Sequence, residues 1–264
     1  MSIIKCVYIL IVFYICSINF ASSAQLLSHK ATYTLNIENI KENSLLEGGQ
    51  GQTFFEITEN CNGWNIKEDY VLIYELPNEK MANSFSSYST FENYLGTKHS
   101  FELNEKSQFS GEKSYQGFIE KNKKIISGSI INDSIKKLTF KNDILFPVEH
   151  LLGLIKAARD GEKIFTKKVF FGNEDKEFIK IVSAFIGQTR NSKLKDIEYL
   201  KGKKIWPIKV AFYKEKSKQE KPEYEIYLEI DSLGVVHNYR VDYGDFEINA
   251  FLKKFYVMPK KKCE

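Results

Sequence analysis

The sequence predicts a mainly β protein, an open barrel of about a dozen or more antiparallel strands wrapped around one central α-helix. Apolar and polar residues alternate from residue 28 onward, which is typical of half-buried strands. Glycine- and asparagine-containing turns divide this alternation at intervals of about ten residues, which favours an antiparallel meander over βαβ units. Only residues 147–160 interrupt the alternation with helical spacing. A meander of this length should curl, and the helix is expected to lie inside the curve.

Residues 1–24 have the layout of a secretory signal peptide. Lys5 provides the positive charge, residues 7–16 form an apolar run, and Ala21-Ser22-Ser23-Ala24 is a small-residue cleavage site. A membrane-spanning helix needs about twenty apolar residues, and no stretch of this chain reaches that length. We therefore expect cleavage near Ala24. Residues 25–264 are expected to form one soluble domain that does not span a membrane.

The first group of strands precedes the helix. Tyr33, Leu35 and Ile37 alternate with polar residues, which predicts a strand with one buried face. The same pattern recurs at 52–58, 64–76, 82–92, 98–104, 114–120, 125–132 and 136–142. Glycine or asparagine lies in the turns at Gly48-Gly49, Asn60–Gly63, Leu95-Gly96 and Ser110-Gly111.

Residues 147–160 are predicted to form the one helix. Apolar residues recur there with the spacing of one helix face, at Val148, Leu151, Leu152, Ile155 and Ala158. Pro147 suits the first helical turn, and Gly161 suits the position just after the helix end. The apolar stripe requires that the helix be buried. Strands are predicted to resume at 163–171, 178–187, 206–213, 223–230, 235–243 and 247–257.

Cysteine usage predicts one disulfide. Of the four cysteines, only Cys61 and Cys263 remain once residues 1–24 are removed. An exported chain with two cysteines is expected to pair them, whereas two thiolates alone are a poor zinc ligand set. The chain has no C-x-x-C pair for redox catalysis. The bond is therefore predicted to be structural.

Segments spread over the chain carry a family resemblance, at Ser28–Tyr33, Cys61–Trp64, Ser84–Glu92, Leu145–His150, Trp206–Tyr213, Pro222–Glu225, Asp242–Phe246 and Pro259–Cys263. Together they resemble the cell-envelope integrity protein B (EipB) family of alphaproteobacterial periplasmic proteins. The resemblance implies a periplasmic β-spiral around a central helix, similar in shape to periplasmic lipoprotein carriers. It also implies a disulfide from an early loop to the C-terminus, here Cys61 to Cys263. A role in envelope integrity through a periplasmic partner, such as a tetratricopeptide-repeat protein, is implied as well, with no catalytic residue or cofactor.

Glu149 and His150 are the best catalytic-looking pair, and a hydrolase that uses them is the weakest of the functional hypotheses. An acid in the first helical turn is explained by the helix dipole, and His150 is expected to be a packing residue. No metal spacing connects His29, His99 and His237, which are expected to be surface or half-buried polar residues.

The segment from Asp242 to Asp245 resembles the start of a calcium loop but lacks the alternating ligands of such a loop. A tight turn with Gly244 at positive φ is the preferred interpretation. No metal or catalytic site is therefore predicted.

Two functional hypotheses remain. The formal charge of +4 comes from interspersed lysines and acids, which argues against nucleic-acid binding. The leading hypothesis is a non-enzymatic periplasmic protein that supports envelope integrity by binding a protein partner. The alternative is a carrier of a lipid or lipoprotein in a groove of the curled sheet. The residues expected to line such a groove, or else to fill the core, are Leu151, Leu152, Ile155 and Trp206.

Overall fold

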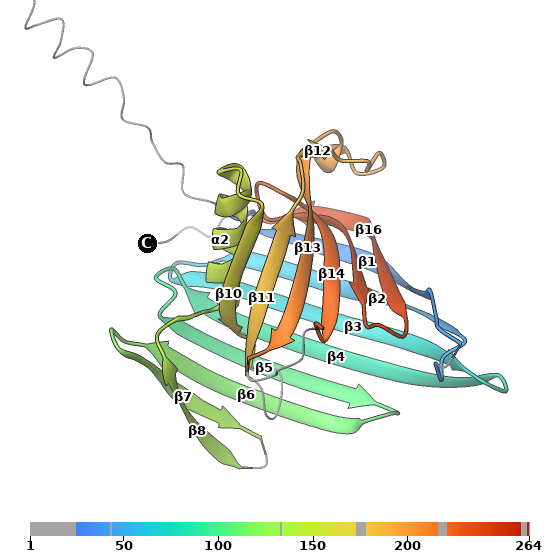
Figure 1. Cartoon of the computed structure of the whole chain (residues 1–264), viewed down its shortest axis with the longest axis horizontal. Helices are drawn as coiled ribbons and strands as arrows, with labels where there is room; N and C mark the ends of the chain where they lie inside the picture. Colours follow the sequence, from blue (N-terminus) through green and yellow to red (C-terminus); the bar gives the residue numbers. More distant parts are fainter. Residues whose placement is uncertain are drawn as a thin grey trace, which may run out of the picture.

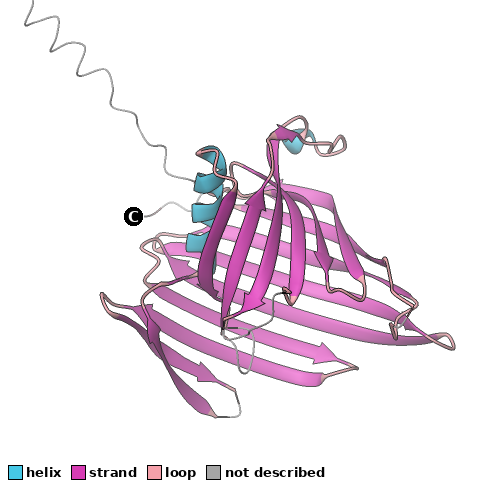
Figure 2. Cartoon of the chain, viewed as in Figure 1, coloured by secondary structure: helices cyan, strands magenta, loops and turns pink. Residues whose placement is uncertain are grey.

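The computed structural model describes residues 25–42, 44–132, 134–172, 178–215, 221–259 and Cys263. The predicted signal peptide, residues 1–24, lies outside the described residues. The predicted mainly β class is confirmed, because the described chain forms a 16-stranded sheet with one α-helix (Figures 1 and 2). The strands before the helix are β1 (His29–Glu38), β2 (Gly48–Glu59), β3 (Gly63–Leu76), β4 (Lys80–Asn93), β5 (Lys98–Ser107), β6 (Gly111–Lys121), β7 (Ile125–Ile131), β8 (Ile135–Lys141) and β9 (Ile144–Leu145). After the helix come β10 (Ile164–Phe170), β11 (Ile179–Ile186), β12 (Arg190–Asn191), a short 3₁₀ turn η1 (Glu198–Leu200), β13 (Lys204–Lys214), β14 (Tyr224–Asp231), β15 (Val236–Asp242) and β16 (Glu247–Val257).

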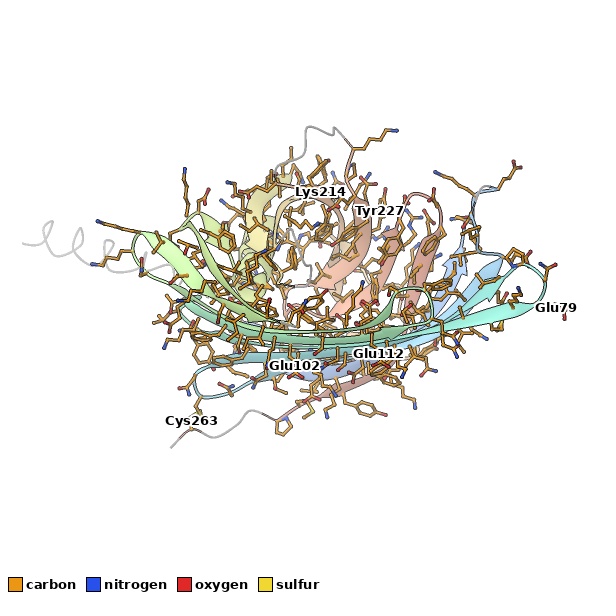
Figure 3. All side chains as sticks on the ribbon, turned by 90° about the horizontal axis from the view of Figure 1, so that it is seen from below. Glu79, Glu102, Glu112, Lys214, Tyr227 and Cys263 are labelled. Carbon is orange, nitrogen blue, oxygen red and sulfur yellow. A yellow bond between two sulfur atoms is a disulfide. The ribbon has the colours of Figure 1, made fainter. Side chains whose placement is uncertain are left out.

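The first and last strands pair in the middle of the sheet. The strand order is β8-β7-β6-β5-β4-β3-β2-β1-β16-β15-β14-β13-β11-β10-β9, and β12 lies beside β13. β1 and β16 are antiparallel from His29 opposite Val257 to Glu38 opposite Glu247, with a bulge at Thr32 and Tyr33. The two edges of the sheet, β8 and β9, are therefore consecutive in the chain. Figure 3 shows the resulting curvature, and the sheet is barrel-like and nearly closed, as expected.

One pair of strands is parallel, which corrects the prediction of a wholly antiparallel sheet. β9 and β10 run in the same direction, with Lys168 opposite Ile144, and the helix connects them as a small βαβ unit. Parallel neighbours need such a crossover connection. The pattern of alternation gave no sign of this unit because β9 has only two residues.

The helix α2 runs from Pro147 to Arg159. Gly161 follows its end with a φ of 79°, and its N–H donates to the carbonyl of Ala158. This confirms the role predicted for Gly161. The buried face differs from the predicted stripe, because it includes Leu154 and Ala157, whereas Leu151 and Leu152 are only half-buried.

The helix belongs to a hydrophobic cluster that draws on both halves of the sheet. Its apolar residues pack with Ile57 and Trp64 of β2 and β3, and with Val182 and Ile208 of β11 and β13. Burial of each large apolar side chain contributes about 1.5–3 kcal/mol. The helix therefore stabilises the curvature by connecting strands that are far apart in the strand order.

A second hydrophobic cluster fills the opening between the two edges. It joins side chains of β5–β8 to side chains around β9–β11, and its members are Phe101, Ile119, Ile126, Ile130, Leu138, Ile144, Phe146, Phe170, Phe178 and Ile179. Gly172 lies so close to Phe101 that a Cβ on this glycine would approach the ring to 2.6 Å. Between the edge strands β8 and β9, where the backbone ladder stops, side-chain packing therefore completes the barrel-like shape.

Candidate functional site

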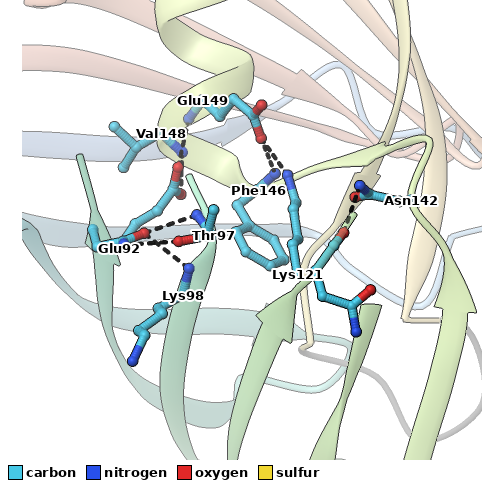
Figure 4. A network of polar contacts seen from close by, with 10 residues as sticks. Glu92, Thr97, Lys98, Lys121, Asn142, Phe146, Val148 and Glu149 are labelled. Carbon is cyan, nitrogen blue, oxygen red and sulfur yellow. Dashed lines mark hydrogen bonds and ion pairs between the residues drawn. The ribbon is translucent and has the colours of Figure 1, made fainter. Parts of the chain in front are cut away.

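The candidate site lies at the start of α2, where the end of β4 meets the helix (Figure 4). Glu92, the penultimate residue of β4, is only 2% exposed. Its Oε2 accepts a hydrogen bond from the backbone N–H of Val148, and its Oε1 accepts one from that of Glu149, both at 2.8 Å. The first N–H groups of a helix have no partner within the helix. A carboxylate from a distant strand therefore caps this helix.

Burial makes Glu92 an unusual carboxylate. Desolvation, with a smaller contribution from the nearby Glu149 carboxylate, raises its pKa to about 7. The two backbone N–H groups and the Lys121 ammonium oppose this shift. Glu92 is therefore expected to exchange a proton near neutral pH, and both of its carboxylate oxygens accept hydrogen bonds from the helix backbone.

The Glu149 carboxylate also accepts hydrogen bonds at the start of α2. Its Oε2 accepts hydrogen bonds from the Lys121 ammonium and, at 3.3 Å, from the backbone N–H of Phe146 (Figure 4). The Lys121 Nζ also lies 4.2 Å from the centroid of the Phe146 ring. Lys121, at the end of β6, thus fixes the helix to a second strand, in agreement with the interpretation of Glu149 as a helix-terminal acid.

His150 is separate from this network. It is buried against Phe165, with a centroid separation of 5.4 Å, and burial lowers its pKa to about 4. Glu149 and His150 therefore have different partners, and the structure does not join them as an acid–base pair. This packing position matches the one expected from the sequence.

A pocket of about 600 Å³ adjoins the helix start. It is lined by Gln25, Glu59, Trp64, Glu92, Asn93, Tyr94, Leu95, Gly96, Val148, Glu149 and Leu152. Glu92 and Glu149 already accept the hydrogen bonds described above. None of the residues that line this pocket is a serine, threonine, cysteine, lysine or histidine, and its ionisable side chains are Glu59, Glu92, Tyr94 and Glu149.

The predicted disulfide lies beside this pocket. Cys61 and Cys263 are bonded, with their Cα atoms 5.5 Å apart, and Figure 3 labels Cys263 at the end of the chain. The Tyr94 hydroxyl, from the pocket wall, donates to the backbone carbonyl of Asn60 at 2.5 Å. The Tyr94 ring also meets Trp64 edge-on at 6.2 Å. The pocket wall and the disulfide loop are therefore one packed unit.

The prediction for His29, His99 and His237 is wrong, because all three are fully buried. Their strands turn them to the inward face, where aromatic rings surround two of them. His99 stacks between Phe101 and Phe146 at 5.8 and 5.2 Å, and desolvation lowers its pKa to about 3. The alternation of the sequence alone did not distinguish the inward face of each strand from the outward face.

Sequence reasoning missed a Ser–His–Asp arrangement. Ser192 Oγ lies 2.7 Å from His237 Nδ1, and His237 Nε2 lies 3.5 Å from Asp231 Oδ2. Hydrolases use these residue types as a catalytic triad, but there the serine attacks an accessible substrate. Here His237 is fully buried, and Asp231 Oδ1 accepts the backbone N–H groups of Leu233 and Val235. The arrangement fixes the segment after β12 to β15, and no spacing in the sequence points to it.

The four residues predicted for a groove or the core come together. Ile155 is buried in the cluster around α2, and Leu151, Leu152 and Trp206 are half-buried against it. This common cluster supports the core alternative, and a ligand groove stays a prediction. At Asp242, the carboxylate accepts the N–H of Gly244 at 2.8 Å, and Gly244 has a φ of 87°, which confirms the tight turn.

No group of three or more metal-ligating side chains occurs in the part of the chain that the structure describes. Within that part, no helix has the length and hydropathy required to cross a membrane.

Comparison with known proteins gives a consistent result. The model of the family described as EipB-like matches residues 20–259. The chain is 23% identical over 242 residues to the cell envelope integrity protein EipB of Brucella abortus (strain 2308), covering 89% of this chain and 85% of that protein. The fold is similar to the crystal structure of a β-barrel-like protein of a domain of unknown function from Brucella abortus. The TM-score is 0.83 at 20% identity, over 89% of this chain and 100% of that chain.

Proposed function

This chain belongs to the EipB-like family, and from this premise we propose that it maintains cell-envelope integrity as a non-enzymatic periplasmic protein. The observation that carries the proposal is the similarity to EipB over most of the length of both proteins. In this proposal residues 1–24 direct export and are removed, and residues 25–264 act as one domain around the central helix. The residues at the start of α2 support a non-enzymatic role, because their polar atoms form hydrogen bonds that fix the helix to the sheet.

We propose that the protein acts through a protein partner in the periplasm, with a tetratricopeptide-repeat protein as one candidate class. A non-enzymatic protein influences the envelope through what it binds, and its curved sheet offers long strands with exposed side chains. Crosslinking in living cells followed by capture of the wild-type protein should recover a specific periplasmic protein. Capture of none would contradict this part of the proposal.

The envelope role is tested by deleting the gene and challenging the strain with detergent and with cell-wall antibiotics. The deletion strain should be more sensitive than its parent, and a plasmid copy of the full chain should restore resistance. A matched copy without residues 2–24 should fail to restore it, because it is not exported. A deletion strain as resistant as its parent would overturn the proposal.

A carrier of a lipid or lipoprotein, with the shape of periplasmic lipoprotein carriers, is the second candidate function. Leu151 and Leu152 of α2, and Trp206 of β13, are only half-buried, and this partial exposure favours it. Polar groups elsewhere on the inward face weigh against it. The hydroxyls of Tyr70 and Tyr239 lie 3.5 Å apart, and burial raises the pKa of Glu68 nearby. Native mass spectrometry of gently purified protein discriminates the two, because a carrier should retain a lipid of defined mass.

A further inference from the structure

The edge strand β8 offers its backbone for pairing. It is the terminal strand of the sheet and, among the strands that the structure describes, pairs only with β7, from Ile125 opposite Lys141 to Ile131 opposite Ile135. Figure 1 shows β7 and β8 at the lower left, with no further strand beyond β8. The chain then continues to β9, at the other edge of the sheet. An edge strand leaves alternate N–H and C=O groups without a ladder partner, which is the backbone pattern that an added strand recognises.

The lysines of this hairpin are not neutralised. Those of the neighbouring strands β5 and β6 all have carboxylate partners, in the pairs Lys98–Glu120, Lys106–Glu112, Lys113–Glu105 and Lys121–Glu149. The hairpin of β7 and β8 carries exposed lysines at Lys136, Lys137 and Lys141, and the turn before β7 carries Lys123 and Lys124. These lysines form no ion pair with any described residue. The hairpin therefore has a local positive charge, although the whole chain has a formal charge of only +4.

The outer face of β8 combines charge with apolar surface. Ile135, Lys137, Thr139 and Lys141 share this face because alternate residues of a strand point the same way. Ile135 is 70% exposed, and its cross-strand partner Ile131 is also exposed. An added strand would meet Ile135 at one end of this face and the ammonium groups of Lys137 and Lys141 farther along it.

We infer that β8 is a strand-addition site for an extended acidic segment of a partner protein. This inference rests on the proposed function, because it names how the partner is held. Backbone hydrogen bonds to β8 would provide much of the affinity, and carboxylates facing Lys137 and Lys141 would select an acidic sequence. A second copy of this chain is a poor occupant, because two lysine-bearing edges would repel each other.

A peptide of alternating glutamate and valine tests the inference with the mature chain. It should bind, whereas the same peptide with alternate backbone nitrogens methylated, or with lysine in place of glutamate, should bind at least about tenfold more weakly. The double variant Lys137→Glu, Lys141→Glu should also lose about tenfold, because two exposed attractions become repulsions. A matched variant, Lys193→Glu with Lys195→Glu, makes the same charge change in the exposed segment after β12, at the top of Figure 1, and should bind like wild type.

Three results would overturn the inference. Lack of binding by the wild-type protein would mean that the lysines only protect the edge from pairing. Equal binding of the methylated peptide would mean an attraction of charge without strand addition. A concentration-dependent dimer that disappears on addition of the acidic peptide would assign the edge to a second copy. Thermal unfolding checks that both double variants are folded.

The same variants separate this inference from the proposed function. If the Lys137→Glu, Lys141→Glu chain restores envelope resistance and still captures the partner, the assignment of β8 is wrong and the proposed function stands. If the wild-type chain itself restores nothing, the proposed function fails whatever β8 binds. A chain that loses both peptide binding and partner capture supports both.

Discussion

Glu92 and His99 face each other across the β4–β5 ladder, and burial shifts their two pKa values in opposite directions. Desolvation favours the neutral form of each group, so the acid holds its proton to higher pH and the imidazole loses its proton at lower pH. Each pKa shift makes the free energy of unfolding depend on pH, in a direction set by whether the pKa is raised or lowered. The two side chains therefore give opposite contributions to the pH dependence of stability.

Glu92 should destabilise the protein as the pH rises. Its pKa in the folded protein is about 7, above the ordinary value of 4.5 that applies to the unfolded chain. Between these values the unfolded chain has released a proton that the folded protein retains, so stability falls with increasing pH by about 3 kcal/mol. Glu92→Gln is expected to remove this component. Urea unfolding at about pH 5 and pH 7.5 measures it, with the exposed Glu102→Gln as control; an unchanged slope in Glu92→Gln would contradict the assignment.

His99 should destabilise the protein as the pH falls. Its pKa in the folded protein is about 3, below the ordinary value of 6.5, so on acidification the unfolded chain binds a proton that the buried ring does not. His99→Phe preserves a ring between Phe101 and Phe146 and removes the titration. Relative to wild type, the variant should gain about 2–3 kcal/mol in unfolding free energy between about pH 7 and pH 4.5. If the difference in unfolding free energy between the two proteins did not change with pH, His99 would have its ordinary pKa in the folded protein.

At the scale of elements, the closure between the sheet edges depends on a close approach of Gly172 to Phe101. Gly172 has a φ of 70°, and Gly202 has a φ of 69° with nothing near the position of a Cβ. Alanine at Gly202 should therefore cost about 1 kcal/mol from backbone strain alone. Alanine at Gly172 should cost about 1–3 kcal/mol more, because its methyl group meets the Phe101 ring.

Urea unfolding of Gly172→Ala and Gly202→Ala isolates the contribution that the contact between residue 172 and Phe101 makes to stability. Phe101→Leu in the Gly172→Ala background should recover part of the added loss, since it removes the atoms nearest the new methyl group. Equal losses in Gly172→Ala and Gly202→Ala would mean that the opening is loosely packed.

The elements that the sequence predicted are those with a local signal. Strands such as β1 alternate along their length, and α2 has a helical repeat with Pro147 and Gly161 at its ends, so each is visible in a short window. β9, with two residues, has no period to detect. The site was less predictable, because Glu92 caps Val148 across a separation of 56 residues. Glu149 was placed correctly since its role depends on its own helical turn. Long-range partners follow from the curvature of the sheet, which no local pattern encodes.

At the scale of the whole molecule, the curved sheet is held by three different kinds of link. Backbone ladders run without interruption from β8 to β9 through the β1–β16 pair. Side chains of the second cluster, which includes Phe101 and Phe170, bridge the opening, and α2 connects strands of both halves. The disulfide adds a covalent link between the loop before β3 and the region after β16, beside the β1–β16 pair. Only this last link is changed by oxidation and reduction.

Loss of the disulfide should therefore lower stability without changing the fold. The bond connects residues 202 positions apart, and the chain-entropy model gives a stabilisation of at most about 5 kcal/mol for so long a loop. For a chain of this size, Cys61→Ser should lower the melting temperature by about 10 °C. A reducing agent should lower the melting temperature of the wild type by a similar amount and leave that of Cys61→Ser unchanged, while a thiol assay detects Cys263 only in the variant. If oxidised wild-type protein has two free thiols, or if reduction does not change its melting temperature, the curved sheet is held by its ladders and side chains alone.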